Sequence, residues 1–132
     1  MKSNIIDVDK GMKVSGEEYA LDELLNIVNT ASAHKDSFVK LFEENEDEYL
    51  ATFSWQSSNK WKVDFPVELH KIHSQRYVTK QQCLKVIRKV YETKTIDGFK
   101  NFINVPVHHF TLDEMLEFKK EDEMLLRSQD PL

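Results

Sequence analysis

Two pairs of histidines are the first residues whose types and spacing could build a chemical site. His70 and His73 are three residues apart, and His108 and His109 are adjacent. On a helix the first pair could share a metal ion, but Pro66 and the strand-like flanks argue against a helix there. Neither pair has a cysteine or glutamate at a recognised ligand spacing. We therefore expect surface or strand-edge histidines, with no metal and no cofactor.

Two single residues could also take part in catalysis. Cys83 could be a nucleophile if it were exposed beside a positive charge, but it falls on the apolar stripe of a predicted helix, so we expect it in the core. Asp64 is a carboxylate in an apolar stretch, as acid–base catalysis requires. Its two-residue period instead places it on the solvent face with Lys60 and Lys62, where a cross-strand ion pair is the simpler interpretation. We do not expect an enzyme.

Acidic residues form the most densely charged segments of the chain. Residues 43–48 hold five carboxylates and no base, and residues 121–123 form part of a second acidic group. Like charges this close destabilise a fold unless they are screened or paired. Because complementary charge accelerates association and disfavours wrong partners, we expect a cationic protein partner. The predicted partner-binding residues are Glu43, Glu44, Glu46, Asp47, Glu48, Glu121, Asp122 and Glu123, with Tyr49 and Tyr77 as aromatic anchors.

Charge also divides the chain into three parts beneath its net value of −5. Residues 1–59 carry 5 bases and 12 acids, residues 60–100 carry 10 bases and 4 acids, and residues 101–132 carry 3 bases and 7 acids. The basic middle part favours an alternative function, a nucleic-acid-binding regulator that uses a helix over residues 80–92. Aromatic residues do not alternate with the bases as a stacking platform would require. Nucleic acid is therefore not the expected partner.

Composition indicates one cytoplasmic globular domain over residues 1–132. Hydrophobic residues make up 40% and charged residues 31% of the chain, and a single cysteine suits a reducing compartment. The N-terminus has no apolar core of a signal peptide, and no apolar run approaches the roughly 18 residues of a membrane span. We expect the two ends, residues 1–14 and 126–132, to be flexible.

Hydrophobic periodicity predicts three helices and four or five strands. Capping-box patterns precede each helix, and two-residue alternation marks the strands. The expected fold is α+β, an antiparallel sheet of four to five strands with helices packed on one face. The helices are expected over residues 17–33, over 80–92 and from 112 onward, and the strands over 38–43, 49–55, 61–65, 67–73 and 99–105.

The tryptophans fix the register of the central hairpin. A three-residue loop over residues 57–59 would place Trp55 opposite Trp61 and Phe53 opposite Val63, all on one half-buried face. Trp-rich strand edges could also pair two copies of the chain, so a homodimer is a second expected assembly.

One sequence pattern resembles a known class of proteins. A helix, the strand Ser37-Phe38-Val39-Lys40-Leu41, a meander with Phe53-Ser54-Trp55 and Trp61-Lys62-Val63, and the stretch from Arg76 to Ile87 are similar to small bacterial immunity proteins over about residues 20–105. The resemblance implies a cytoplasmic, non-enzymatic inhibitor of a polymorphic or contact-dependent toxin, often a nuclease. It assigns no interface residue, and the basic helix departs from a simple acid-against-base docking scheme.

Overall fold

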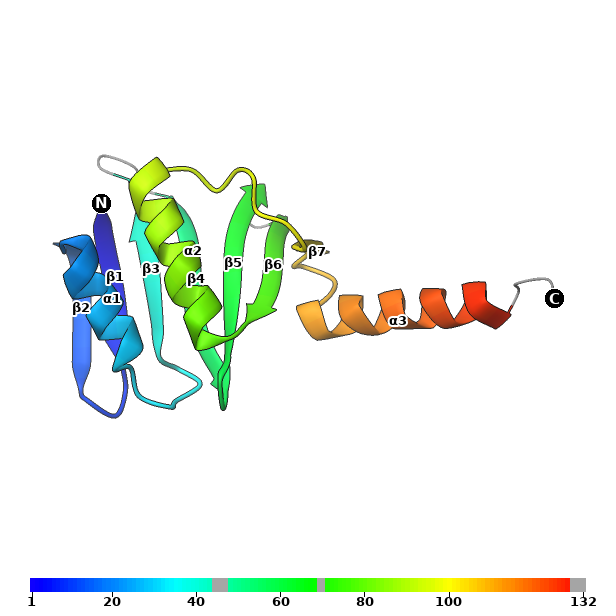
Figure 1. Cartoon of the computed structure of the whole chain (residues 1–132), viewed down its shortest axis with the longest axis horizontal. Helices are drawn as coiled ribbons and strands as arrows, with labels where there is room; N and C mark the ends of the chain where they lie inside the picture. The colour runs from blue at the N-terminus through cyan, green and yellow to red at the C-terminus, as the bar shows by residue number, and fades with distance from the viewer. Residues whose placement is uncertain (44–47, 69–70, 129–132) are drawn as a thin grey trace.

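The computed structural model describes residues 1–43, 48–68 and 71–128 of the chain. These residues form one antiparallel sheet in the order β2-β1-β3-β4-β5-β6-β7, with three helices (Figure 1). The α+β class is confirmed, but seven strands replace the four to five predicted. The strands are β1 (Lys2–Asp7), β2 (Met12–Glu18), β3 (Phe38–Phe42), β4 (Tyr49–Ser57), β5 (Lys60–Glu68), β6 (Ile72–Val78) and β7 (Ile103–Pro106). The helices are α1 (Leu21–Asn29), α2 (Lys80–Thr93) and α3 (Leu112–Ser128).

The N-terminal hairpin was missed in the sequence. Residues 1–14, which we expected to be a flexible end, form β1 and the first part of β2. In β1 the side chains of Ser3, Ile5 and Asp7 are buried on one side of the sheet. Two of these three residues are polar, so the strand shows no alternation of hydrophobicity. Buried polar groups therefore concealed this strand.

The first helix is shorter than predicted. α1 runs over Leu21–Asn29 and not over residues 17–33, because residues 12–18 pair with β1 as a strand. Ser15 has the spacing of a capping residue but lies within that strand. The actual N-cap is Ala20, whose side chain makes no capping hydrogen bond.

The central hairpin has the predicted register for a different reason. Trp55 lies opposite Trp61 and Phe53 lies opposite Val63. The turn has only residues 58–59 between the strands, and a β-bulge after Trp55 supplies the extra residue. β4 and β5 are central strands, and Trp61 is only 2% exposed. The idea that tryptophans form a sheet edge is therefore wrong.

The later strands also differ from prediction. β5 continues through Pro66, and a register shift follows that residue, which has no N–H to donate. β6 begins at Ile72, so the predicted strand over residues 67–73 is wrong. β7 is shorter than residues 99–105 because Phe99 and Phe102 pack on the ring of Phe65 instead.

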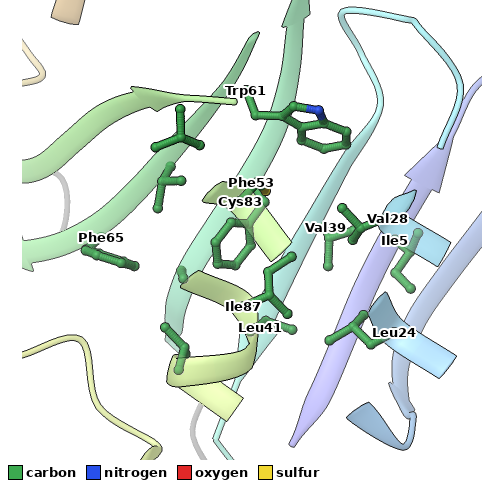
Figure 2. Packing of buried hydrophobic residues seen from close by; sticks show 14 residues of the cluster. Ile5, Leu24, Val28, Val39, Leu41, Phe53, Trp61, Phe65, Cys83 and Ile87 are labelled. Carbon is green, nitrogen blue, oxygen red and sulfur yellow. The ribbon is translucent and has the colours of Figure 1, made fainter. Parts of the chain in front are cut away.

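The core lies between the sheet and two helices. α1 and α2 cover the same face of the sheet (Figure 1), and Figure 2 shows Leu24, Val28 and Ile87 among the strand side chains. All three are 0% exposed, as is Phe53 beneath them. Fully burying a side chain of this size stabilises the fold by about 2 kcal/mol before entropy is counted. The packing of α1 and α2 on one face of the sheet holds the strands in place, so the side chains on the other face have fixed positions.

Helix α2 agrees with its sequence pattern. It starts at Lys80 and ends at Thr93. The Thr79 side chain accepts from the backbone N–H of Gln82, and the Gln82 side chain accepts in return from the N–H of Thr79. Cys83 is fully buried, as predicted from its place on the apolar stripe. Burial raises the pKa of its thiol.

Helix α3 departs from the predicted arrangement. It begins at the predicted Leu112, where the Thr111 hydroxyl accepts from the Glu114 N–H at 3.2 Å. It contacts β7 and then extends away from the rest of the molecule (Figure 1). Leu112 is 3% exposed, whereas Leu116, one turn farther along the helix, is 38% exposed. Helix packing on one face therefore holds for α1 and α2 and not for α3.

Candidate partner interface

The predicted acidic residues 43–48 lie in the sequence between the end of β3 and the start of β4, which are at one end of the sheet (Figure 1). Glu44, Glu46 and Asp47 lie outside the described residues. Glu43 follows β3 and is half-buried, and Glu48 precedes β4 and is exposed. The structure thus places two of the five predicted acids together at this end.

A hollow of about 220 Å³ lies beside these two acids. Its walls combine polar and apolar surface in equal parts, and the side chain of Val67 in it is 61% exposed. Carboxylates at the rim of an apolar surface suit a lysine or arginine side chain, which packs its aliphatic stem and keeps its charged end near the rim. The hollow is lined by Glu43, Glu48, Tyr49, Leu50, Pro66, Val67 and Ile96.

Tyr49, one of the two predicted anchors, is held within the fold. Its hydroxyl donates to Asp64 Oδ2 at 3.1 Å, and its ring meets Phe42 edge-on with centroids 6.4 Å apart. The Lys40 Nζ atom lies 4.8 Å from the ring centroid. Burial, followed by the charge of Asp64, raises the pKa of Tyr49. The ring is therefore a fixed wall of the hollow, which lowers the entropy cost of binding there.

Asp64 is the centre of a buried polar cluster. It is 6% exposed on the face of the sheet opposite α1 and α2. His73 Nδ1 lies 2.8 Å from its Oδ1, Gln75 Nε2 donates to the same oxygen at 2.6 Å, and Tyr49 donates to Oδ2. Three partners on neighbouring strands satisfy the carboxylate, as a buried charge requires.

This cluster corrects two predictions. The ion pair of Asp64 with Lys60 or Lys62 is wrong, since the carboxylate is already bound and Lys60 Nζ lies 4.0 Å from the ring centroid of Tyr77 instead. His73 is not a surface residue but 9% exposed. The signal that was available is the alternation within β6, which puts the polar residues His73, Gln75 and Tyr77 on one face.

The Asp64–His73 pair has the geometry of the carboxylate and imidazole in a catalytic triad. However, His73 Nε2 is buried and has no hydrogen-bond partner among the residues that the structure describes. In this structure that nitrogen is not open to solvent. The pair therefore links β5 to β6, with Gln75 and Tyr49 completing the network.

The second predicted anchor belongs to another part of the surface. The Tyr77 hydroxyl donates to Asp113 Oδ1 at 2.7 Å, at the start of α3. Burial, followed by that hydrogen bond and the charge of Asp113, raises the pKa of Tyr77. Residues 121–123 are exposed farther along α3, on the side of the molecule away from the β3–β4 connection (Figure 1). The predicted acids and anchors thus form two separate groups.

The basic helix lines a different hollow. A space of about 540 Å³ lies between α1 and α2, and its charged walls are Lys85 and Arg88. Two other lysines of α2 are bound elsewhere. Lys80 donates from Nζ to the Asn29 carbonyl at 2.9 Å, and Lys89 Nζ lies 4.8 Å from the ring centroid of Phe99. The remaining residues of this hollow are Leu25, Asn26, Asn29, Gln81 and Leu84.

The other histidines lie on the surface or outside the described residues. His108 and His109 are exposed in the turn after β7, and His70 is not among the described residues. Within the described ranges, no three side chains of His, Cys, Asp or Glu are placed to hold a metal ion together. None of the helices in those ranges has the length and apolar character needed to cross a membrane.

Comparison with known proteins gives no relative. No family model, no curated protein and no solved structure matches the chain.

Proposed function

We propose that the protein is an immunity protein that binds and blocks a cognate cationic bacterial toxin in the cytoplasm. The proposed toxin is a nuclease. The observation that supports this most directly is the acid-rimmed hollow at the start of β4. It combines apolar side chains with Glu43 and Glu48, next to a segment with three further carboxylates. The resemblance of residues 20–105 to immunity proteins supports the same class.

The proposed mechanism is occlusion guided by charge. A nuclease presents cationic side chains to bind phosphate, and the acidic end would attract that surface from a distance. One lysine or arginine of the toxin would enter the hollow and pack along Val67 and Pro66. The rigid ring of Tyr49 would exclude water from that contact, as residues around a central anchor do.

The experiment uses the toxic domain encoded in the neighbouring reading frame as its probe. Calorimetric titration of the full-length protein should give tight binding, and co-expression should restore growth of cells that make the toxin. Val67→Lys should weaken binding by about tenfold or more, because it places a like charge where the partner's cation lies. Val8→Lys is the matched control, since Val8 is 40% exposed in the turn at the opposite end of the sheet.

Two results would contradict the proposal. The first is a toxic domain that neither binds nor loses its toxicity. The second is equal weakening by Val67→Lys and Val8→Lys, which would move the interface away from the hollow even if the toxin binds.

A second candidate function is nucleic-acid binding at the hollow between α1 and α2. The observation in its favour is that Lys85 and Arg88 line this space together with the amides of Asn26 and Asn29, a set that can bind phosphate oxygens. Filter binding of duplex and single-stranded probes tests it. Lys85→Ala with Arg88→Ala should abolish salt-sensitive retention, and an unchanged titration would remove this candidate.

A further inference from the structure

Helix α3 exposes apolar side chains along most of its length. Phe118 is 42% exposed and meets the ring of Phe110 edge-on, and Met124 is 61% exposed, in a helix that contacts β7 and whose Asp113 accepts from Tyr77 of β6. A helix of 17 residues is about 25 Å long. Such a helix gains most of its stability from packing one face against something else. The exposed side chains of α3 therefore offer an apolar surface to a partner.

One face of α3 combines these apolar side chains with acids. Glu117, Glu121 and Met124 are spaced by four and seven residues, which places them on the same side of a helix, and Phe118 borders that side. Glu123 lies on the other side. A surface that covers this face must be apolar in part and must carry positive charge.

The chain itself presents such a surface. The face of the sheet opposite α1 and α2 carries half-buried aromatic side chains, including Phe38 and Phe42. Cross-strand pairing places Ile6 opposite both Lys13 and Phe38, and Ser54 opposite both Phe38 and Lys62, in one row across the strands. The lysines of this face are Lys2, Lys13, Lys40, Lys60 and Lys62. Its charge and its aromatic side chains complement α3.

The same molecule cannot make this contact with its own helix. The first turn of α3 is fixed by buried Leu112 and by the bond from Tyr77 to Asp113. From that point the helix extends past the edge strand β7 and away from β3 and β4 (Figure 1). A fold-back would break the anchoring contacts, whereas a second copy can receive the helix without changing them.

We propose that α3 of one copy docks on the helix-free face of the sheet in a second copy of this chain, and that its own sheet receives the partner's α3 in return. The exchange is a symmetric dimer with two equal contacts. In each contact Glu117 and Glu121 face the lysines on β3 and β5, and Phe118 and Met124 pack on the aromatic side chains. The acidic hollow at the β3–β4 connection is a separate feature of the surface.

The test is a charge exchange followed by sedimentation equilibrium at low salt. The wild-type protein should form a species of twice the 15.6 kDa of one chain. The helix variant Glu117→Lys with Glu121→Lys, and the sheet variant Lys40→Glu with Lys62→Glu, should each raise the dimer dissociation constant about tenfold or more, because attraction becomes repulsion in both contacts. Two single variants serve as a matched control. Glu121→Lys should raise the dimer dissociation constant, whereas Glu123→Lys, which makes the same charge change on the other side of α3, should leave it unchanged.

Mixing the two variants gives the sharpest result. In the mixed dimer the basic helix of one variant meets the acidic sheet of the other, and the two unaltered surfaces meet each other, so dimerisation should return to the wild-type level. Circular dichroism of each variant confirms that it is folded.

Three outcomes would overturn the inference. They are a wild-type protein that stays monomeric, variants that dimerise as wild type does, and a mixture that does not restore the dimer. If the wild-type protein stays monomeric and binds single-stranded RNA through Lys40 and Lys62, the cationic face of the sheet is a nucleic-acid surface instead.

Discussion

The buried cluster around Asp64 gives a prediction that can be worked from the structure. Asp64→Ala removes the acceptor of His73 Nδ1 and of Gln75 Nε2, which are both buried, and of the half-buried Tyr49 hydroxyl. A buried donor without a partner costs about 1–3 kcal/mol. Because the half-buried Tyr49 hydroxyl can donate to water instead, we count the two buried donors and expect a loss of about 2–6 kcal/mol in the free energy of unfolding.

Urea unfolding monitored by tryptophan fluorescence measures this loss. With a slope of about 2 kcal/mol per molar urea, the midpoint should fall by about 1–3 M. Asp64→Asn keeps one acceptor oxygen and should lose less than Asp64→Ala. Glu68→Ala is the control, since Glu68 pairs with Lys71 on the surface with its side chain 55% exposed, and such surface changes stay within about 0.5 kcal/mol. An Asp64→Ala protein as stable as the Glu68→Ala protein would refute the structural role of the cluster.

Three further predictions concern other parts of the fold. Because burial raises the pKa of the Cys83 thiol, iodoacetamide should label the native protein far more slowly than the urea-unfolded protein by mass spectrometry, and equal rates would contradict its burial. Burial alone would raise the pKa of Asp7, but hydrogen bonds from Ser32 and the charge of Lys10 hold it below the ordinary 3.8. The ionised Asp7 carboxylate therefore stabilises the fold above pH 3.8, and this stabilisation is lost as pH falls through the lower pKa of the folded state. The unfolding free energies of wild type and Asp7→Asn should converge in acid. Values that diverge in acid would contradict this account. Thr79→Ala removes the capping box of α2 and should cost about 1 kcal/mol in the same urea assay, with Ser58→Ala in the exposed hairpin turn as the unaffected control.

The sequence predicted those elements whose pattern is local. The box from Thr79 to Gln82 located the start of α2, and the alternation around Trp55 and Trp61 located the central hairpin. These signals depend on neighbouring residues alone. They therefore survive whatever tertiary contacts the rest of the chain makes.

The missed features depend on partners distant in the chain. Asp7 occupies a core-facing position of β1 because Ser32 donates to its carboxylate, while the Ser37 hydroxyl accepts from the N–H of the next residue, Val8. Ser3, at the other end of the strand, is buried without a hydrogen-bond partner for its hydroxyl among the described residues. Asp64 appeared to face solvent because its partners His73 and Gln75 are on the next strand. Polar residues that satisfy one another resemble a solvated face until the sheet brings them together.

The candidate interface was predicted only in part. The acidic character of residues 43–48 was visible in the sequence, but the hollow beside it needs Val67 and Ile96, which come from β5 and from the segment after α2. Tyr77 and the acids of α3 proved to be a separate group, because the hydrogen bond from Tyr77 to Asp113 and the burial of Leu112 set the direction of α3.

The association rate with the toxic domain tests the central claim most directly. Stopped-flow mixing at low and at physiological salt should compare wild type with a variant carrying Glu43→Gln, Glu44→Gln, Glu46→Gln, Asp47→Asn and Glu48→Gln. Two smaller variants are matched, because each removes two negative charges. The first carries Glu43→Gln with Glu48→Gln, and the second carries Asp9→Asn with Asp36→Asn at the opposite end of the sheet. The account predicts that the five-residue variant associates about tenfold or more slowly at low salt and loses most of the salt dependence, and that only the first of the two smaller variants slows association. Equal rates for wild type and the five-residue variant at low salt would contradict it.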